Sequence, residues 1–112
     1  MTNISDCFKD FRKLGIVARQ NFLCCQGCGT AQLAYESEKK NYARKRGYIF
    51  YHKQDAEKWR EEGCLHLSFG TFDDSDPVPM MTSAVTILRR RGFKVDWDGT
   101  AAQRPEVTKE AA

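Results

Sequence analysis

Three of the five cysteines in this 112-residue chain fall within five consecutive positions. Cys25 and Cys28 form a CxxC step, and Cys24 stands directly before it. Two thiolates at this spacing can bind zinc, which takes sulfur and nitrogen ligands in tetrahedral geometry. They can also act in thiol chemistry, or they can be buried as small apolar side chains. Because no second CxxC follows, the motif alone does not choose among these roles.

A zinc site would need ligands beyond the CxxC. The candidates to join Cys25 and Cys28 are His52, Cys24, Cys64 and His66. We take Cys25, Cys28 and His52 as the metal-binding hypothesis. Cys24 is expected to be a poor partner for Cys25, because neighbouring residues of a strand point in opposite directions.

The same cysteines could serve thiol chemistry. The apolar run 22–25 predicts a short strand, and Thr30 predicts the N-cap of the following helix, which places the CxxC near a helix N-terminus. That position favours the thiolate form. In an enzyme, Cys25 would be the nucleophile or redox thiol, His52 the general base and Asp55 the residue that orients it. Spacing alone does not establish such a geometry, so the sequence favours a structural cysteine turn without catalysis.

The helices and strands around this stretch are predicted from the spacing of apolar residues and from capping residues and glycines. Ser5 predicts the N-cap of a first helix that ends at Gly15. The run 48–52 is apolar on both faces, which predicts a central strand with His52 at its end. Asp55 then predicts the N-cap of a short helix over 56–62.

The second half of the chain predicts a βαβ unit. Residues 64–69 alternate between apolar and polar, as a half-buried strand does. Asp76 and Pro77 predict the start of a helix over 77–91, and 93–97 follows as a strand. We therefore predict an α+β or α/β fold, in which a mixed sheet of about four strands contains one βαβ unit and has helices packed against it.

Length and pattern indicate one globular domain over residues 1–100, followed by a polar C-terminal tail over 101–112. Within the tail, Glu106–Thr108 predicts a short edge strand. We expect a folded core that is monomeric or forms a homodimer. The edge strand or the Met80–Met81 region would supply the dimer contact, since methionine adapts well to interfaces.

The amino-acid composition limits the classes of partner that we expect for this protein. The 18 Lys and Arg stand against 15 Asp and Glu, giving a net charge of +3 and a pI near 8.6. Nucleic-acid binding is not expected from so mixed a charge. No apolar run approaches the roughly 20 residues of a membrane helix, and the N-terminus has no signal-peptide pattern. We expect a cytoplasmic protein with reduced thiols and no cofactor, zinc at the cysteines being the alternative.

Four sequence blocks, in order, resemble a family of small bacterial domains of unknown function. The blocks are NFxCCQxCG from Asn21, GYxFYHxQD from Gly47, LxLxFG from Leu65 and WDG from Trp97. The resemblance covers the chain from about Gly15 to Gly99 and implies no established activity. The motif positions with chemistry are Cys24, Cys25, Cys28, His52 and Asp55, whereas Cys7, Cys64 and His66 lie outside the motif.

Two functional classes follow. The first is a non-enzymatic interaction or accessory module that binds another protein, a class that includes small bacterial and phage inhibitors, with the cysteine turn as a structural feature. The second is a small thiol- or zinc-dependent enzyme, or a redox protein, that uses the CxxC at 25–28 with His52. The sequence favours the first, because no catalytic constellation is complete in it.

Overall fold

The computed structural model describes residues 3–40, 42, 45–73 and 75–109. Helices and strands are interleaved along the chain in an α+β fold, as predicted. The helices are α1 (Ile4–Lys13), α2 (Gln26–Lys39), α3 (Lys53–Glu62) and α4 (Val78–Arg90). The strands are β1 (Ile16–Arg19), β2 (Gly47–Phe50), β3 (Cys64–His66), β4 (Ser68–Gly70), β5 (Lys94–Asp96) and β6 (Glu106–Thr108). None of the helices described has the length and apolar character that a membrane span requires.

The strands form two three-stranded sheets, where we predicted one sheet of about four. One has the order β1–β2–β4, and the other β3–β6–β5. The division occurs at Leu67. Its backbone N–H still donates to the carbonyl of Pro105 at 3.0 Å, next to β6, whereas the following residue, Ser68, pairs with Phe50 of β2. The segment predicted as a single strand over 64–69 therefore becomes β3 in one sheet and β4 in the other.

The βαβ connection also differs from the expected one. β3 and β5 lie in one sheet, but β6 runs antiparallel to both and separates them. The parallel neighbours are β1 and β2, which α2 connects. β1 is only four residues long and almost fully buried, so it lacks the alternation that reveals a strand in sequence.

The segment expected as an edge strand in a polar tail is the middle strand of its sheet. β6 pairs with β3 through Leu65 and with β5 through Val95, and Val107 between them is fully buried. Its edges are thus not free for a homodimer contact. Met80 and Met81 are also unavailable, because they are 3% and 0% exposed in the core. A homodimer would need another surface.

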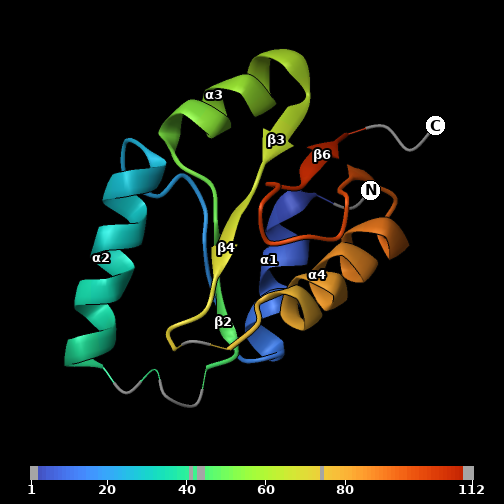
Figure 1. Cartoon of the computed structure of the whole chain (residues 1–112). Helices are drawn as coiled ribbons and strands as arrows, with labels where there is room; N and C mark the ends of the chain where they lie inside the picture. The colour runs from blue at the N-terminus through green and yellow to red at the C-terminus, as the bar shows by residue number, and fades with distance from the viewer. Residues whose placement is uncertain (1–2, 41, 43–44, 74, 110–112) are drawn as a thin grey trace.

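The sheet β1–β2–β4 stands between α2 on one side and α1 and α4 on the other (Figure 1). As predicted, β2 is its central strand, and successive side chains of β2 face opposite layers. Ile49 packs into the larger core on the side of α1 and α4, and Phe50 packs with Leu33 of α2. The stripe predicted on α4 faces the larger core, with Ala84, Val85 and Leu88 buried.

The first helix begins at Ile4 with Asn3 as its N-cap, where we predicted Ser5. The Asn3 side chain accepts the N–H of Asp6 at 3.2 Å, and Asp6 returns a bond to the Asn3 N–H, which makes a capping box. Ser5 instead donates its hydroxyl to Gln20 at 3.2 Å. α4 begins at Val78 with Pro77 as its N-cap, one residue later than predicted, although Asp76 does accept the N–H of Val78 at 3.0 Å.

Candidate metal centre

The loop between β1 and α2 brings three cysteines together. Asn21 and Leu23 adopt the left-handed conformation, with φ of 51° and 61°. Two backbone bonds of 2.9 Å hold this shape, from the Phe22 N–H to the Tyr51 carbonyl and from the Lys53 N–H to the Leu23 carbonyl. The strand expected here does not form, because left-handed residues cannot continue an extended ladder.

α2 begins at Gln26, earlier than the start at Thr30 that we predicted. Cys25 is therefore the N-cap, and Cys28 lies in the first turn of the helix. The first helical bond runs from the Gly29 N–H to the Cys25 carbonyl at 3.0 Å. This start places both cysteines of the CxxC at the positive end of the helix dipole.

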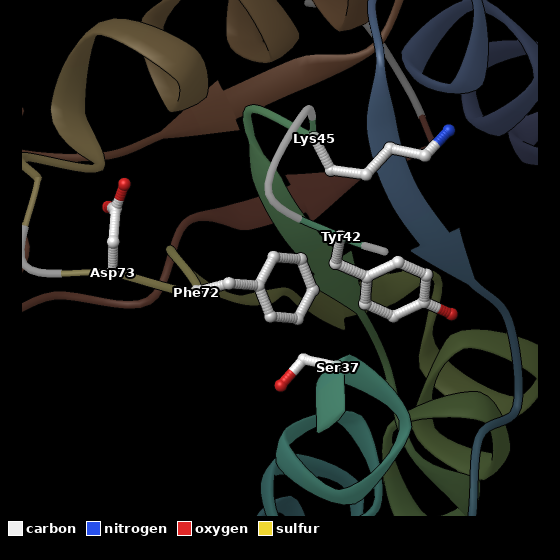
Figure 2. A pocket seen from close by; sticks show the side chains of 5 residues that line it. All are labelled: Ser37, Tyr42, Lys45, Phe72 and Asp73. Carbon is white, nitrogen blue, oxygen red and sulfur yellow. The ribbon is translucent and has the colours of Figure 1, made fainter. Parts of the chain in front are cut away.

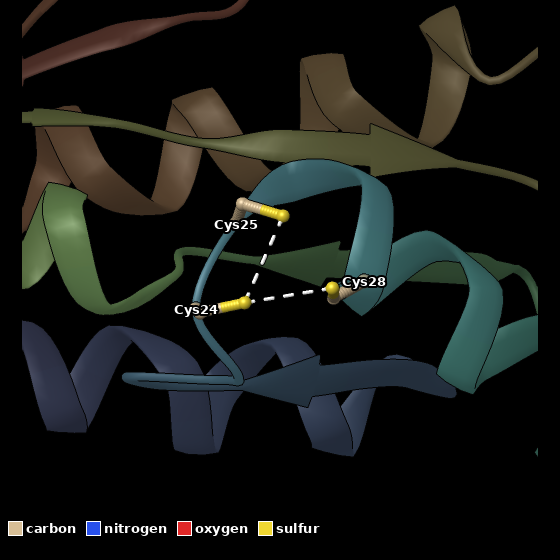
Figure 3. A group of neighbouring side chains, drawn as sticks. All are labelled: Cys24, Cys25 and Cys28. Atoms are coloured by element: carbon tan, nitrogen blue, oxygen red, sulfur yellow. Dashed lines mark hydrogen bonds between the residues drawn. The ribbon is translucent and has the colours of Figure 1, made fainter.

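The sulfur atoms of Cys24, Cys25 and Cys28 all lie within 4.8 Å of one another. The Cys24 sulfur is 3.5 Å from that of Cys28 and 3.9 Å from that of Cys25 (Figure 3). Sulfurs around one tetrahedral zinc ion, at about 2.3 Å from it, stand about 3.8 Å apart. The expectation that Cys24 points away is wrong, because it assumed an extended strand that the left-handed turn replaces.

The cluster lies at the surface. Cys24 and Cys28 are exposed, and Cys25 is partly buried. In contrast, Cys7 is fully buried in the larger core. The three clustered thiols are thus open to solvent, which differs from a turn that merely buries small apolar side chains.

Cys25 and Cys28 differ in acidity. The pKa of Cys25 is lowered, first by the backbone N–H of Cys28 and then by the thiols of Cys28 and Cys24. The pKa of Cys28 is raised to about 11, first by its contact with Cys24 and then by that with Cys25. Of these two cysteines, Cys25 is therefore the one that ionises more readily, as expected for a cysteine at a helix N-terminus.

His52 and Asp55 belong to a second, buried polar cluster. His52 rather than Asp55 is the N-cap of α3: its Nδ1 accepts the Asp55 N–H at 3.3 Å, and the Asp55 carboxylate accepts the His52 N–H at 3.2 Å. The same carboxylate lies 3.1 Å from His52 Nε2 and accepts a hydrogen bond from Arg104 at 2.7 Å. Burial lowers the pKa of His52, and the Asp55 charge opposes this shift. Both ring nitrogens of a neutral His52 are thus engaged with Asp55.

The predicted site residues therefore separate into two groups. Cys25 and Cys28 meet, and Cys24 joins them. In the described parts of the chain, no His, Asp or Glu joins this group. His66 instead pairs with Glu106 at 3.2 Å. Sequence reasoning missed Arg104, because a lone arginine in a polar tail carries no signal of a partner 49 residues away.

A pocket of about 270 Å³ lies elsewhere, beside the C-terminal half of α2. Its lining consists of Ser37, Tyr42, Lys45, Phe72 and Asp73 (Figure 2). The rings of Tyr42 and Phe72 form one wall, with centroids 5.0 Å apart. The Ser37 hydroxyl and the Asp73 carboxylate are both hydrogen-bonded within the chain. This pocket therefore combines an aromatic wall with polar side chains, of which Ser37 and Asp73 already have partners, and the cysteine cluster is the stronger candidate site.

The comparison with known families agrees with the predicted resemblance. The model of a family described as "Domain of unknown function (DUF6891)" matches residues 2–111. The chain belongs to this family. Searches of curated proteins and of solved structures found no match. The membership of a family of unknown function is thus confirmed, and the DUF6891 match assigns no role to the cysteines.

Proposed function

We propose that this DUF6891 domain is a small metal-binding module in which Cys24, Cys25 and Cys28 are the ligands and zinc is the preferred ion. The observation that carries the proposal is the convergence of three surface sulfurs, two of them on exposed residues, at separations suited to one tetrahedral ion. An all-sulfur donor set selects soft or borderline metals such as zinc over magnesium or calcium. Metal would also stabilise the left-handed turn that brings Cys24 to the cluster.

We further propose that the module acts through another protein and not by catalysis. The side chains that could serve as base and orienter, His52 and Asp55, bond to one another in a buried cluster with Arg104. Neither is grouped with the thiols. The mixed surface charge, with a net value of only +3, suits a protein partner better than a nucleic acid.

A second candidate is thiol–disulfide exchange, which the position of Cys25 at the N-cap of α2 favours. The Cys25 thiolate would attack a disulfide of a partner protein, and Cys28 would then attack the mixed disulfide. Cys25 and Cys28 would lose two electrons and two protons, and the partner would leave with two thiols. Metal binding ranks first because it uses all three sulfurs, whereas exchange leaves the role of Cys24 unexplained.

The test is a zinc titration of the reduced protein, with elemental analysis and a count of reactive thiols. We expect one zinc per chain and protection of three thiols from an alkylating reagent. Cys24→Ser, Cys25→Ser and Cys28→Ser should each weaken zinc binding at least roughly 100-fold, more than typical losses of an outer hydrogen bond to a ligand. Cys64→Ser is the matched control, since this partly buried thiol lies outside the cluster.

Two other results would contradict the proposed zinc site. If the reduced protein binds no zinc, and Cys25 and Cys28 form a disulfide that a thiol buffer reverses, exchange becomes the better function. Failure of Cys24→Ser alone to weaken zinc binding would remove Cys24 from the ligand set.

A further inference from the structure

The proposed metal centre lacks one ligand, and the inference that follows rests on the proposed function. Closed zinc sites take four protein ligands. All five cysteines and both histidines of the chain lie within the described residues. Among the described residues, only Cys24, Cys25 and Cys28 form a group of potential ligands.

The other sulfur and imidazole donors are committed elsewhere in the fold. Cys7 is fully buried in the larger core, and His52 caps α3. Cys64 and His66 lie on β3, where each residue pairs with β6. Among the described residues, no further cysteine or histidine is therefore placed to complete the cluster.

Leu23, the residue directly before the cluster, has two unusual properties. The residue is 43% exposed, and its φ of 61° is one that residues with a Cβ avoid. The bond from the Lys53 N–H to the Leu23 carbonyl holds this conformation. Strained conformations that the surrounding structure maintains concentrate at binding sites. Leu23 therefore combines a strained backbone with an exposed apolar side chain, and it directly precedes the cysteine cluster in the chain.

We propose that a cysteine of a partner protein supplies the fourth ligand, and that apolar residues next to it contact Leu23. A thiolate fits best, because it matches the three soft donors already present. Cys24 and Cys28 are exposed, so the open coordination position is reachable from solvent. On binding, the partner thiol releases its proton to water and its sulfur bonds to the metal.

The test uses the full chain loaded with one equivalent of Co²⁺, which reports its sulfur ligands by charge-transfer absorbance. The probe is the peptide acetyl-Leu-Cys-Leu-amide, and the controls are acetyl-Leu-Ser-Leu-amide and acetyl-Ser-Cys-Ser-amide. We expect the absorbance per cobalt to rise by about one third, as three sulfur ligands become four, and to saturate at one peptide per metal. The serine-centred peptide should give no rise, and the serine-flanked thiol should bind roughly tenfold more weakly.

The variant Leu23→Asn tests the apolar contact with the peptide separately from metal binding. Asparagine accepts the left-handed conformation readily, so the variant should fold and still bind one cobalt. It should lose the tenfold preference for the leucine-flanked peptide. If it keeps that preference, the assigned role of Leu23 is wrong.

The outcomes distinguish this inference from the proposed function. Absence of cobalt or zinc binding would overturn the metal site itself. Metal binding with an absorbance that the cysteine peptide does not change would leave the function standing and overturn the partner ligand. A four-sulfur spectrum before any peptide is added, with the chain sedimenting as a dimer, would assign the fourth ligand to a second copy and also overturn the proposal.

Discussion

Gly29, in the first turn of α2, lies directly against the ring of Phe50 in β2. A Cβ atom at position 29 would be 2.5 Å from Cε2 of that ring and 2.8 Å from Cζ. Phe50 is fully buried, and Phe22 packs edge-on against it with centroids 5.7 Å apart. The helix can approach the strand this closely only because residue 29 has no side chain. This approach positions the N-terminus of α2, and with it the cysteine cluster, beside the end of β2.

Gly29→Ala should therefore destabilise the fold by about 1–3 kcal/mol, the cost of overpacking a core, although alanine is the better helix former. Gly27→Ala is the matched control in the same turn, since a Cβ there meets nothing within 4 Å. It should stabilise the protein by up to about 1 kcal/mol. Urea denaturation measures the free energy of unfolding of both variants. Equal gains in stability would show that α2 is not packed this tightly on Phe50.

Asn3→Ala should cost about 1 kcal/mol of the free energy of unfolding, because it removes the N-cap of α1. Ser5→Ala should cost less than about 0.5 kcal/mol, since Ser5 lies within the helix and only its hydroxyl bond to Gln20 is lost. Thermal or urea unfolding of the two variants gives the comparison. A larger loss for Ser5→Ala would favour the N-cap predicted from the sequence.

The ion pair between Arg19 and Glu36 predicts a pH dependence of stability. Its shortest N–O distance is 2.6 Å, and the Glu36 side chain is 12% exposed. Hydrogen bonds from Arg19, followed by those from Gln32 and Tyr42, lower the pKa of Glu36 from 4.5 to about 2. Because the folded pKa is depressed, this stabilisation is fully present above pH 4.5 and is lost as the pH falls through about 2.

Glu36→Gln should thus lower the free energy of unfolding at neutral pH by about 1–2 kcal/mol. The difference from the wild type should shrink between pH 4.5 and about 2, where Glu36 itself becomes protonated. Urea titrations at several pH values provide the measurement. A difference that stays constant over this range would mean that the Glu36 charge does not contribute to stability.

Val107→Ala should cost roughly 1–3 kcal/mol, because it truncates a fully buried side chain between two strands. Thr108→Ala, at the next and partly exposed position of β6, should cost less than about 1 kcal/mol. Denaturation midpoints would decide this. Similar small effects at both positions would support the polar tail with an edge strand that we first expected.

Local features of this fold follow from the sequence. The alternation that contains Leu65 and Leu67 predicts which face of the strand is buried, and the apolar stripe along 78–90 predicts the buried face of the helix. Both predictions are possible because the period of a strand or helix is contained within a few residues. The apolar run at 48–52 likewise identified the central strand. The CxxC indicated where to look for a site.

Only the tertiary structure decided how these pieces join. β6 became a middle strand because β3 and β5 both pair with it, and nothing within Glu106–Thr108 encodes two partners. The sulfurs of Cys24 and Cys28 lie close together because the loop contains two left-handed residues, and backbone hydrogen bonds with Tyr51 and Lys53 hold that turn. Side-chain periodicity is a property of neighbours along the chain, whereas backbone pairing depends on segments that are distant in sequence and close only after folding.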